Sequence, residues 1–544
     1  MTAEPAHDTT ASDGSLTHRQ ILVVLSGLLL GMFLAALDQT VVATAMRTIA
    51  DRLDGQTAQA WVTTAYLITA TISTPLYGKL SDMYGRKPFY LFAISIFIVG
   101  SMLCGTAHSI YELAAYRAVQ GIGAGGLLSL AFTIVGDLVP PRERGRYQAY
   151  FMAVFGSSSV LGPVVGGFLA GQQHLLGLDG WRWIFYLNVP IGLAALTVVF
   201  RVLHLPDRRS DHRVDYVGAV LLSTAIVPLL IVAEKGREWG WGSGRATTLI
   251  VVGLLALAAF LPWERRMGEE ALLPLRVFQN RTFSLTAAIS FLVGAAMFGG
   301  LVNIPLYLQI VKGESPTRAG LLTVPLVLGI MVASGTAGKV MSRTGRYKVF
   351  PVLGSALLVV ALLLFSTLTV STALPVAMAF MVVMGVGLGL TMQTLVIAVQ
   401  NAMPPQDMGV ATSSATFFRS MGGTFGAAVG LSVLFGTVSG NIRERAVAGR
   451  LPAAVIDRFG QASALNDTSG LGRLPTAVRD VVLGGFADSL QTVFFTVALF
   501  VVPAFVLALF LREIPLRRQG GLAAARSAGA EQQGQVARSE TTAV

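Results

Sequence analysis

The sequence predicts an all-α polytopic membrane protein with 14 transmembrane helices, and three observations support this fold class. Of the 544 residues, 53% are hydrophobic and only 13% are charged, whereas soluble domains have about 45–50% and about 25%. Apolar runs of about 20 residues, the length that crosses the core of a bilayer, recur along the whole chain. Glycine is abundant, with 59 residues, as in membrane helices that pack closely.

The apolar runs give the predicted helices in chain order. They lie near residues 21–45, 60–78, 89–106, 110–135, 149–170, 182–200, 216–233, 246–263, 284–310, 319–340, 349–370, 374–399, 410–437 and 488–511. The first run is long and follows a polar stretch of about twenty residues with no small-residue cleavage site, so we interpret it as a retained helix rather than a signal peptide. The chain ends, 1–19 and 512–544, are rich in small and polar residues and are expected to be disordered cytoplasmic tails.

Lysine and arginine set the predicted orientation, because cytoplasmic loops carry an excess of both. An even number of spans puts both termini on one side, and placing them inside brings most basic clusters into the cytoplasm. The loop 438–487 is also basic, but long loops cross a membrane largely regardless of charge, so we expect it outside. The predicted location is the inner (cytoplasmic) membrane, with both termini cytoplasmic.

Composition also argues against several other functions. The net charge is +11, but the cations lie in short clusters between apolar runs rather than on one face, so we expect no nucleic-acid partner. The single cysteine, Cys104, and six histidines in tails or at loop edges indicate no metal site. No phosphate-cradling loop and no nucleophile–base pattern is present. We therefore expect no cofactor and no enzymatic activity.

Glycine motifs reveal an internal repeat. The first half contains Gly78-Lys79 with Gly85-Arg86, the helix glycines 121, 123 and 125, and the pair 162 and 166; the second half contains Gly338-Lys339 with Gly345-Arg346, glycines 385, 387 and 389, and the pair 426 and 430. The displacement is 260 residues for the loop and 264 for both helix motifs. We interpret this as a duplication.

The repeat divides the chain into six, two and six helices. The predicted parts are an N-terminal six-helix bundle (20–200), a two-helix insert with a linker (201–283) and a C-terminal six-helix bundle (284–511) that includes the loop 438–487. Parallel-related bundles are typical of transporters, which bind substrate near the midplane between the halves.

Several motifs resemble those of one transporter family. They are Leu37-Asp38-Gln39-Thr40-Val41-Val42, the loop from Gly78 to Lys87, Arg117 with Gln120-Gly121-Ile122-Gly123, the glycines around Pro163, and the string from Trp181 to Pro190. From about residue 20 to 511 the chain resembles the fourteen-helix drug:proton antiporters of EmrB/QacA type in the major facilitator superfamily. The resemblance implies a major facilitator fold and a multidrug efflux transporter, working as a monomer among membrane lipids. It would exchange inward protons, its energy source, for an amphipathic or cationic small molecule.

Asp38 and Arg117 are the candidate proton-coupling residues. Asp38 lies about 17 residues into the first run, within or near the low-dielectric core, where a lone charge is costly. Arg117 falls at a comparable depth in the fourth run, and its guanidinium keeps its proton. Asp38 can be a protonation switch, or a structural residue near the outer interface that bonds to the backbone and never titrates. Arg117 can pair with it in proton coupling, or the pair can merely tether two helices. The position 264 residues after Arg117 is Met381, so coupling is expected mainly in the first bundle.

The loop after the second run is a candidate gate latch. It gathers an acid among cations between two glycines that permit tight turns: Gly78, Lys79, Asp82, Gly85, Arg86 and Lys87. Such a cluster can hold one conformation and break in the other, or it can be a solvated loop that only fixes topology. The second copy has Ser342 in place of Asp82, so a second latch would lack its central acid.

The fifth run carries the candidate hinge, the antiporter motif of Gly156, Gly162, Pro163, Gly166 and Gly167. Small residues allow close helix crossing, and proline allows a local bend. Packing without a mechanical role is the alternative.

Aromatic and polar residues along the spans are candidates for a substrate pocket, which suits bulky amphipathic ligands when it is mostly apolar. The residues chosen are Phe33, Tyr66, Phe155, Asn303, Gln393 and Arg419. Glu112, at the outer start of the fourth run, either contacts an external vestibule or is simply hydrated. Trp181 and Trp183 fit an interfacial aromatic belt. The alternative function on the same fold is export of a lipid or an endogenous metabolite, or uptake.

Overall fold

The computed structural model describes residues 18–54, 60–203, 215–268, 270–404, 407–449 and 475–516. Nearly all of these residues are helical. The helices of the first half are α1 (His18–Arg52), α2 (Ala60–Tyr84), α3 (Arg86–Thr106), α4 (Ile110–Leu138), α5 (Pro141–Gly171), α6 (Trp183–Tyr186) and α7 (Asn188–Val202). A short hairpin of β1 (His174–Leu175) and β2 (Leu178–Asp179) precedes α6.

The second half begins after a helical pair, α8 (Tyr216–Trp239) and α9 (Gly244–Met267). It contains α10 (Arg281–Leu306), α11 (Pro316–Leu322), α12 (Val324–Thr344), α13 (Val349–Phe365), α14 (Leu374–Ala402), α15 (Met408–Ala448) and α17 (Thr476–Leu509). Short turns of other helix types lie at Gly180–Arg182, Leu275–Gln279 and Tyr307–Val311.

Twelve helical segments within the described ranges are long and apolar enough to cross a membrane. The two predicted spans outside that set are α13, which has 17 residues, and α2, which is rich in Thr and Ser. The hydroxyls of α2 are accommodated by its own backbone: Thr69 donates to the Ala65 carbonyl (3.0 Å) and Thr74 to the Ala70 carbonyl (2.8 Å). The structure therefore supports between 12 and 14 spans.

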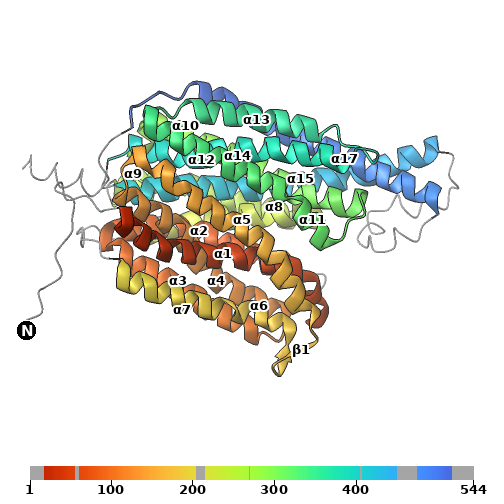
Figure 1. Cartoon of the computed structure of the whole chain (residues 1–544), viewed down its shortest axis with the longest axis horizontal. Coiled ribbons are helices and arrows are strands. Elements are labelled where there is room, and N and C mark those ends of the chain that lie inside the picture. Colours follow the sequence, from red (N-terminus) through yellow and green to blue (C-terminus); the bar gives the residue numbers. More distant parts are fainter. Residues whose placement is uncertain are drawn as a thin grey trace, which may run out of the picture.

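The helices form two groups with the same internal packing. In Figure 1, α1 to α7 lie in the lower part of the molecule and α10 to α17 in the upper part. The neighbours correspond: α1 packs on α5 as α10 packs on α15, α2 on α4 as α12 on α14, and α3 on α4 as α13 on α14. α8 and α9 pack on each other, and α8 also contacts α2 and α15, so this pair lies against both groups.

The repeated glycines occupy matching helix crossings. A methyl group on Gly121 of α4 would overlap the backbone of Tyr66 in α2, and one on Gly385 of α14 would overlap the backbone of Leu326 in α12. Only a residue without a side chain permits this approach of two backbones. The internal repeat in the sequence is thus a repeat in the packing.

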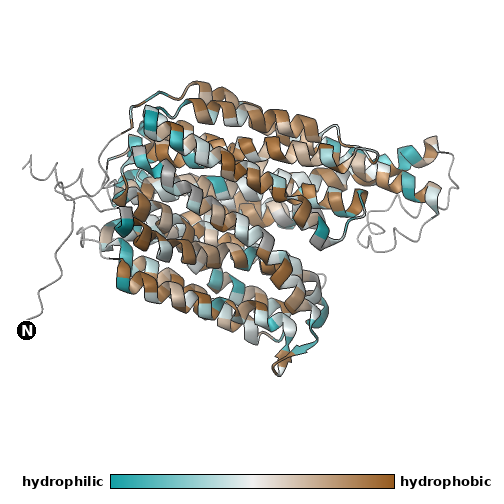
Figure 2. Cartoon of the chain, viewed as in Figure 1, coloured by the Kyte–Doolittle hydropathy of each residue, from teal (hydrophilic) through white to brown (hydrophobic). Residues whose placement is uncertain are grey.

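The outer surface is apolar along the length of the helices. Figure 2 shows hydrophobic residues along the helices and hydrophilic residues concentrated at their ends. Large side chains such as Phe200, Leu255 and Val332 are 64–65% exposed. So much exposed apolar surface requires an apolar surrounding, as in a lipid bilayer.

Two predicted boundaries differ from the structure. In the predicted loop 438–487, α15 continues to Ala448 and α17 already begins at Thr476; residues 450–474 lie outside the described part. Of the predicted tails, residues 18–19 belong to α1 and residues 512–516 form a defined segment, while 1–17 and 517–544 are not described.

Candidate functional site

A buried ion pair lies between α1 and α4. The Nη1 of Arg117 is 2.5 Å from the Oδ2 of Asp38, and the two side chains are 2% and 0% exposed. The structure therefore brings together the two residues that the sequence selects for proton coupling. Removing one partner of such a buried pair leaves the other charge uncompensated, at a cost of about 3–5 kcal/mol.

Two amides complete the coordination of Asp38. Its Oδ1 accepts hydrogen bonds from Gln120 Nε2 (2.9 Å) and from Asn188 Nδ2 (2.7 Å). Gln120 also accepts from Arg117 Nη1 (2.6 Å), and Asn188 donates to Ser101 Oγ (3.0 Å). Both oxygens of the buried carboxyl group of Asp38 are therefore satisfied by side chains of α4 and α7.

An aromatic ring covers the arginine. The guanidinium carbon of Arg117 lies 4.0 Å from the ring centroid of Tyr66 in α2. Its Nε has no hydrogen-bond partner among the described residues. The arginine is thus held on one side by Asp38 and on another by a π face, which attracts cations without fixing their direction.

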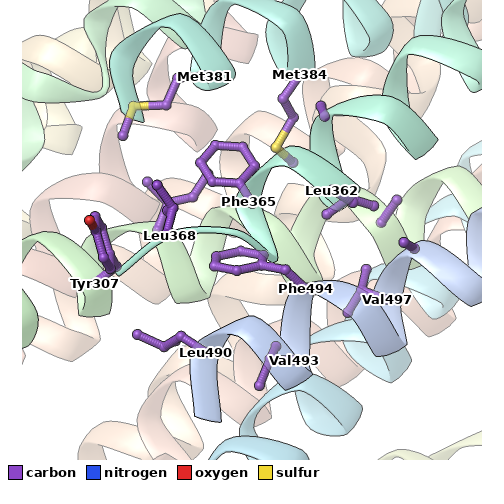
Figure 3. Close-up of a cluster of buried hydrophobic side chains, with 14 of the residues drawn as sticks. Tyr307, Leu362, Phe365, Leu368, Met381, Met384, Leu490, Val493, Phe494 and Val497 are labelled. Carbon is purple, nitrogen blue, oxygen red and sulfur yellow. The ribbon is translucent and has the colours of Figure 1, made fainter. Parts of the chain in front are cut away.

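The corresponding region of the second half is apolar. Met381 and Met384, 264 residues after Arg117 and Gln120, belong to a buried hydrophobic cluster with Phe365, Phe494 and other side chains. Figure 3 shows this cluster, with the sulfur atoms of both methionines among aromatic and aliphatic groups. The charged network therefore has no counterpart at these positions, as the sequence predicts.

The candidate latch joins the two groups of helices at one end. We call this end, where α2 turns into α3, the Gly85 end; Gly85 itself has φ 96°, a conformation that favours glycine. Asp82 forms an ion pair with Arg86 and accepts from the backbone N–H groups of Gly409 (3.1 Å) and Val410 (2.8 Å) at the start of α15. A carboxylate at a helix N-terminus also benefits from the helix dipole.

Arg86 connects this latch to α4. Its Nε lies 2.8 Å from Asp137 Oδ2, and its Nη1 donates to Ser81 Oγ (2.8 Å). Arg86 therefore bridges two acids from two helices of the first group.

The other predicted latch residues divide into two sets. A methyl group on Gly78 would overlap Ser413 and Gly409 of α15, and Lys79 is buried, so both lie at the junction. Lys87 instead donates to the Phe200 carbonyl (2.8 Å) in α7 and lies over the ring of that residue. Lys87 thus stays within the first group, and its assignment to the latch does not fit the structure.

A second junction, which the sequence did not predict, lies at the same end. Arg144 of α5 donates to Gln400 Oε1 of α14 (2.5 Å) and to carbonyls of its own half at Gly136 and Val139. Gln400 in turn donates to the Phe132 carbonyl (3.2 Å). The signal available in the sequence was a polar residue, Gln400, at the end of an apolar run, at the position that the repeat relates to Gly136.

The second copy of the latch loop is closed by a different acid. Ser342 occupies the position equivalent to Asp82, but Glu513 accepts from the backbone N–H groups of Tyr347 (2.8 Å) and Lys348 (3.3 Å). Burial and the nearby Glu513 raise the pKa of the Tyr347 hydroxyl to about 12, so this tyrosine stays neutral and donates to the Arg512 carbonyl (2.8 Å).

The hinge motif on α5 faces two directions. Methyl groups on Gly162 and Gly166 would overlap Thr40 and Val41 of α1, whereas one on Gly156 would meet Val327 of α12 in the other half. Pro163 lies near Gly320 of α11, also in the other half, and nothing lies near Gly167. Four of the five motif residues therefore lie at helix contacts.

The substrate-pocket candidates differ between the halves. Phe33 and Phe155 are packed against hydrophobic clusters of the first half, and Tyr66 covers Arg117. In the second half, Asn303 Oδ1 and both polar atoms of Gln393 are buried without a partner in the described part of the chain.

Arg419 of α15 also makes no hydrogen bond or ion pair with any described residue, and it is half-buried. Polar groups without a partner among the described residues therefore remain in both halves, since the Tyr66 hydroxyl and Arg117 Nε are also unpaired.

The structure changes the interpretation of two residues at helix ends, Glu112 and Trp181. Glu112 accepts from the His108 N–H (2.8 Å) and from the Tyr116 hydroxyl (2.9 Å), so it caps the start of α4. Trp181 is buried, packed edge to face on Phe185, because the 3-10 turn before α6 directs it inward. Trp181 therefore does not belong to an interfacial belt.

Comparison with known proteins identifies the family. The model of the Major Facilitator Superfamily matches residues 28–427. The chain belongs to the Major Facilitator Superfamily. Members of this superfamily are membrane transporters and not enzymes, and this facilitator is accordingly a multi-pass membrane transporter.

Relatives of this facilitator include efflux proteins. It is 38% identical to an uncharacterized MFS-type transporter of Mycobacterium tuberculosis, over 91% of this chain and 70% of the relative. It is 32% identical to the multidrug transporter protein MdtP of Bacillus subtilis, over 93% and 95% of the two chains.

A solved structure shares the fold. This facilitator superposes on the proton:xylose symporter XylE with a TM-score of 0.60 at 15% identity, over 93% of this chain and 99% of that chain. This likeness supports the architecture alone.

Proposed function

We propose that this facilitator is a proton-coupled exporter of amphipathic or cationic compounds across the cytoplasmic membrane. It acts as a monomer of two six-helix bundles, 20–200 and 284–511, and fourteen spans that include α2 and α13. The helices α8 and α9 are an insert between the bundles. The multidrug transporter among its relatives supports the substrate class.

The observation that carries this proposal is the buried network around Asp38. Asp38 has three side-chain donors, one of which is an arginine. Ionisable residues inside membrane-spanning bundles are costly and usually mark proton or substrate pathways. Protonation neutralises Asp38 and releases Arg117, whose remaining neighbours are Gln120 Oε1 and the face of Tyr66. The freed guanidinium then changes the packing of α1 against α4, which moves the first bundle relative to the second.

The energy available is sufficient for export. A membrane potential supplies about 2.3 kcal/mol per charge per 100 mV, and one pH unit adds about 1.4 kcal/mol. A hundredfold outward gradient costs about 2.7 kcal/mol. One or two protons per cycle are therefore enough, and no cofactor is required.

The conformation follows from the two junctions. Asp82 with α15, and Arg144 with Gln400, hold the bundles together at the Gly85 end. We assign this end to the cytoplasm, because the basic clusters and both termini belong there under the positive-inside rule. The state is then closed toward the cytoplasm, in which Asp38 would receive its proton from outside.

The test is Asp38→Asn in proteoliposomes with an imposed pH gradient and a lipophilic fluorescent cation as cargo. We expect proton-driven transport to be lost while cargo still binds, since the amide cannot exchange a proton. Asp480→Asn, an exposed carboxyl on α17, is the matched control and should transport normally. Gradient-driven transport by Asp38→Asn at the wild-type rate would remove Asp38 from the mechanism.

A second cargo class is favoured by Arg419. A guanidinium inside a membrane helix without a partner among the described residues suits a substrate with an anionic group, such as an endogenous acidic metabolite or lipid. In the same proteoliposomes, an amphipathic anion would then compete with the cation, and Arg419→Gln would abolish that competition.

A further inference from the structure

Two acids meet at the Gly85 end of the α8–α9 insert. Asp215 directly precedes α8, and Glu264 lies in the last turn of α9, after which the chain turns at Gly268 (φ 58°) and runs back along the helix. Asp215 is 4% exposed and Glu264 is 1% exposed. Two carboxyl groups so close and so buried need a physical explanation.

Each carboxyl group has one satisfied and one unsatisfied oxygen. Asp215 Oδ1 accepts from the Gly218 N–H (2.7 Å) and from Trp263 Nε1 (2.9 Å). Glu264 Oε2 accepts from the Leu273 N–H (3.0 Å). Asp215 Oδ2 and Glu264 Oε1 are buried and have no donor among the described residues.

The two unsatisfied oxygens face each other across Gly218. A methyl group on Gly218 would overlap both Asp215 Oδ2 and Glu264 Oε1. The two carboxyl groups lie within hydrogen-bonding reach of each other. A hydrogen bond between carboxyl oxygens requires a proton on one of them, and a pair of bare carboxylates at this distance would repel.

We propose that Asp215 and Glu264 form a proton-binding site that holds one proton between the two carboxyl groups. The shared proton satisfies both buried oxygens at once. It also reduces the charge of the pair from two negative charges to one. The pair titrates as a unit, so the proton belongs to neither residue alone.

The remaining negative charge faces a cation of the latch. α8 packs on α2 and α15, and Lys79 of α2 interacts electrostatically with Glu264 as well as with Asp82 and Asp407. Arg276 of the linker pairs with Asp407 (2.9 Å). With one proton bound, the single negative charge of the acid pair is matched by the positive charge of Lys79. Without that proton, one excess negative charge is buried at the junction between insert and latch.

This site is separate from the network of Asp38. It lies in the insert rather than in the first bundle, at the Gly85 end rather than within the α1–α4 contact. It would make the docking of the insert depend on the pH of the compartment at that end. The inference does not depend on the cargo or on proton-driven transport.

The first experiment is infrared spectroscopy of the full-length protein in nanodiscs. At neutral pH we expect a protonated-carboxyl C=O band that shifts in D₂O. This band should be lost in Glu264→Gln and in Asp215→Asn and should persist in Asp480→Asn. If the band is absent from the wild type, or unchanged in both variants, the proposal is wrong.

The second experiment measures thermal stability against pH and remains informative if spectra overlap. The folded pair holds a proton that the unfolded chain releases at neutral pH, so wild-type stability should fall as pH rises. Glu264→Gln carries an amide that donates to Asp215 permanently, so it should fold and should lose less stability on the same pH rise. Equal pH dependence in the wild type and Glu264→Gln would contradict the proposal.

Discussion

The residues around Asp38 differ in how well the sequence alone predicts their role. Asp38 and Arg117 could be predicted, because a charge inside an apolar run is rare and requires a partner of opposite charge. Gln120 and Asn188 stood in the recognised motifs, but nothing in the sequence gave them a role. Asn188 contacts Asp38 from α7, 150 residues away, and an uncharged amide does not require a partner of opposite charge. Its contact depends on how α7 is rotated against α1, which only tertiary packing decides.

Asn188 provides a prediction at this scale. Asn188→Ala removes one of the hydrogen bonds to Asp38, and a hydrogen bond to a charged group contributes about 1.5–3 kcal/mol. The buried ion pair loses this support, so the variant should unfold at a lower temperature and should transport more slowly under an imposed pH gradient. Thermal unfolding and transport rates in proteoliposomes measure the two effects.

Ser101→Ala is the control for a purely structural effect. Ser101 bonds to Asn188 and to the Phe185 carbonyl but not to Asp38. We expect a lower melting temperature for this variant with proton-driven transport at the wild-type rate. Transport by Asn188→Ala at the wild-type rate would show that Asn188 only supports the fold.

At the scale of helices, apolar runs predicted where the chain is helical but not where helices end. The run near 410–437 stops where charges begin, yet α15 continues to Ala448. The extension is stabilised by contact with α17, where Arg445 Nη2 donates to Asp488 Oδ1 (2.7 Å). Ion pairs between distant segments leave no pattern in hydropathy, so the predicted loop was too long.

The glycines of α5 allow a matched test of helix packing. Gly166→Ala places a methyl group against the backbone of Val41 in α1, whereas Gly167→Ala meets nothing within 4 Å. We expect the first substitution to destabilise the protein by about 1–3 kcal/mol. The second should be neutral or stabilise by up to about 1 kcal/mol, because alanine favours a helix.

Thermal unfolding in detergent, with transport as a second reading, compares the two variants. Equal melting temperatures for both would show that α1 and α5 can separate at little cost. A loss of transport by Gly166→Ala with unchanged stability would instead support a mechanical role for this contact.

At the scale of the whole molecule, the repeat was visible in the glycines, and the packing of the two groups repeats accordingly. The links between the groups were less visible. Asp82 was predicted as a latch acid, but its partners are backbone N–H groups at the start of α15, which any residue could supply. Gln400, in contrast, links the two groups through its side chain, so a single substitution can remove this link.

Gln400→Ala should shift the molecule toward a form open at the Gly85 end. The substitution removes bonds to Arg144 (2.5 Å), to the Phe132 carbonyl (3.2 Å) and to Thr412 (3.0 Å). Spin labels at exposed Tyr84 and Val349 would report on the Gly85 end, and labels at Leu176 and Val447 on the opposite end. In a Cys104→Ser background, the first distance should lengthen and the second should shorten.

Gln491→Ala is the control for that measurement. Gln491 donates to the Leu368 carbonyl (2.7 Å) within the second group, so its loss should leave both distance distributions unchanged. Identical distributions in Gln400→Ala and the wild type would show that the Arg144–Gln400 contact does not hold the groups together.

The acid that closes the second latch loop follows α17 in the sequence. Glu513 binds the backbone at Tyr347 and Lys348, and Leu516 donates to the Gly345 carbonyl (3.2 Å). During synthesis, the loop at residues 345–348 therefore lacks these hydrogen bonds until residues 513–516 have left the ribosome. A reporter protein fused directly after Leu511 would separate the capping residues from the helices, whereas a fusion beyond 516 would preserve them, so the choice of junction decides whether a tagged version matures.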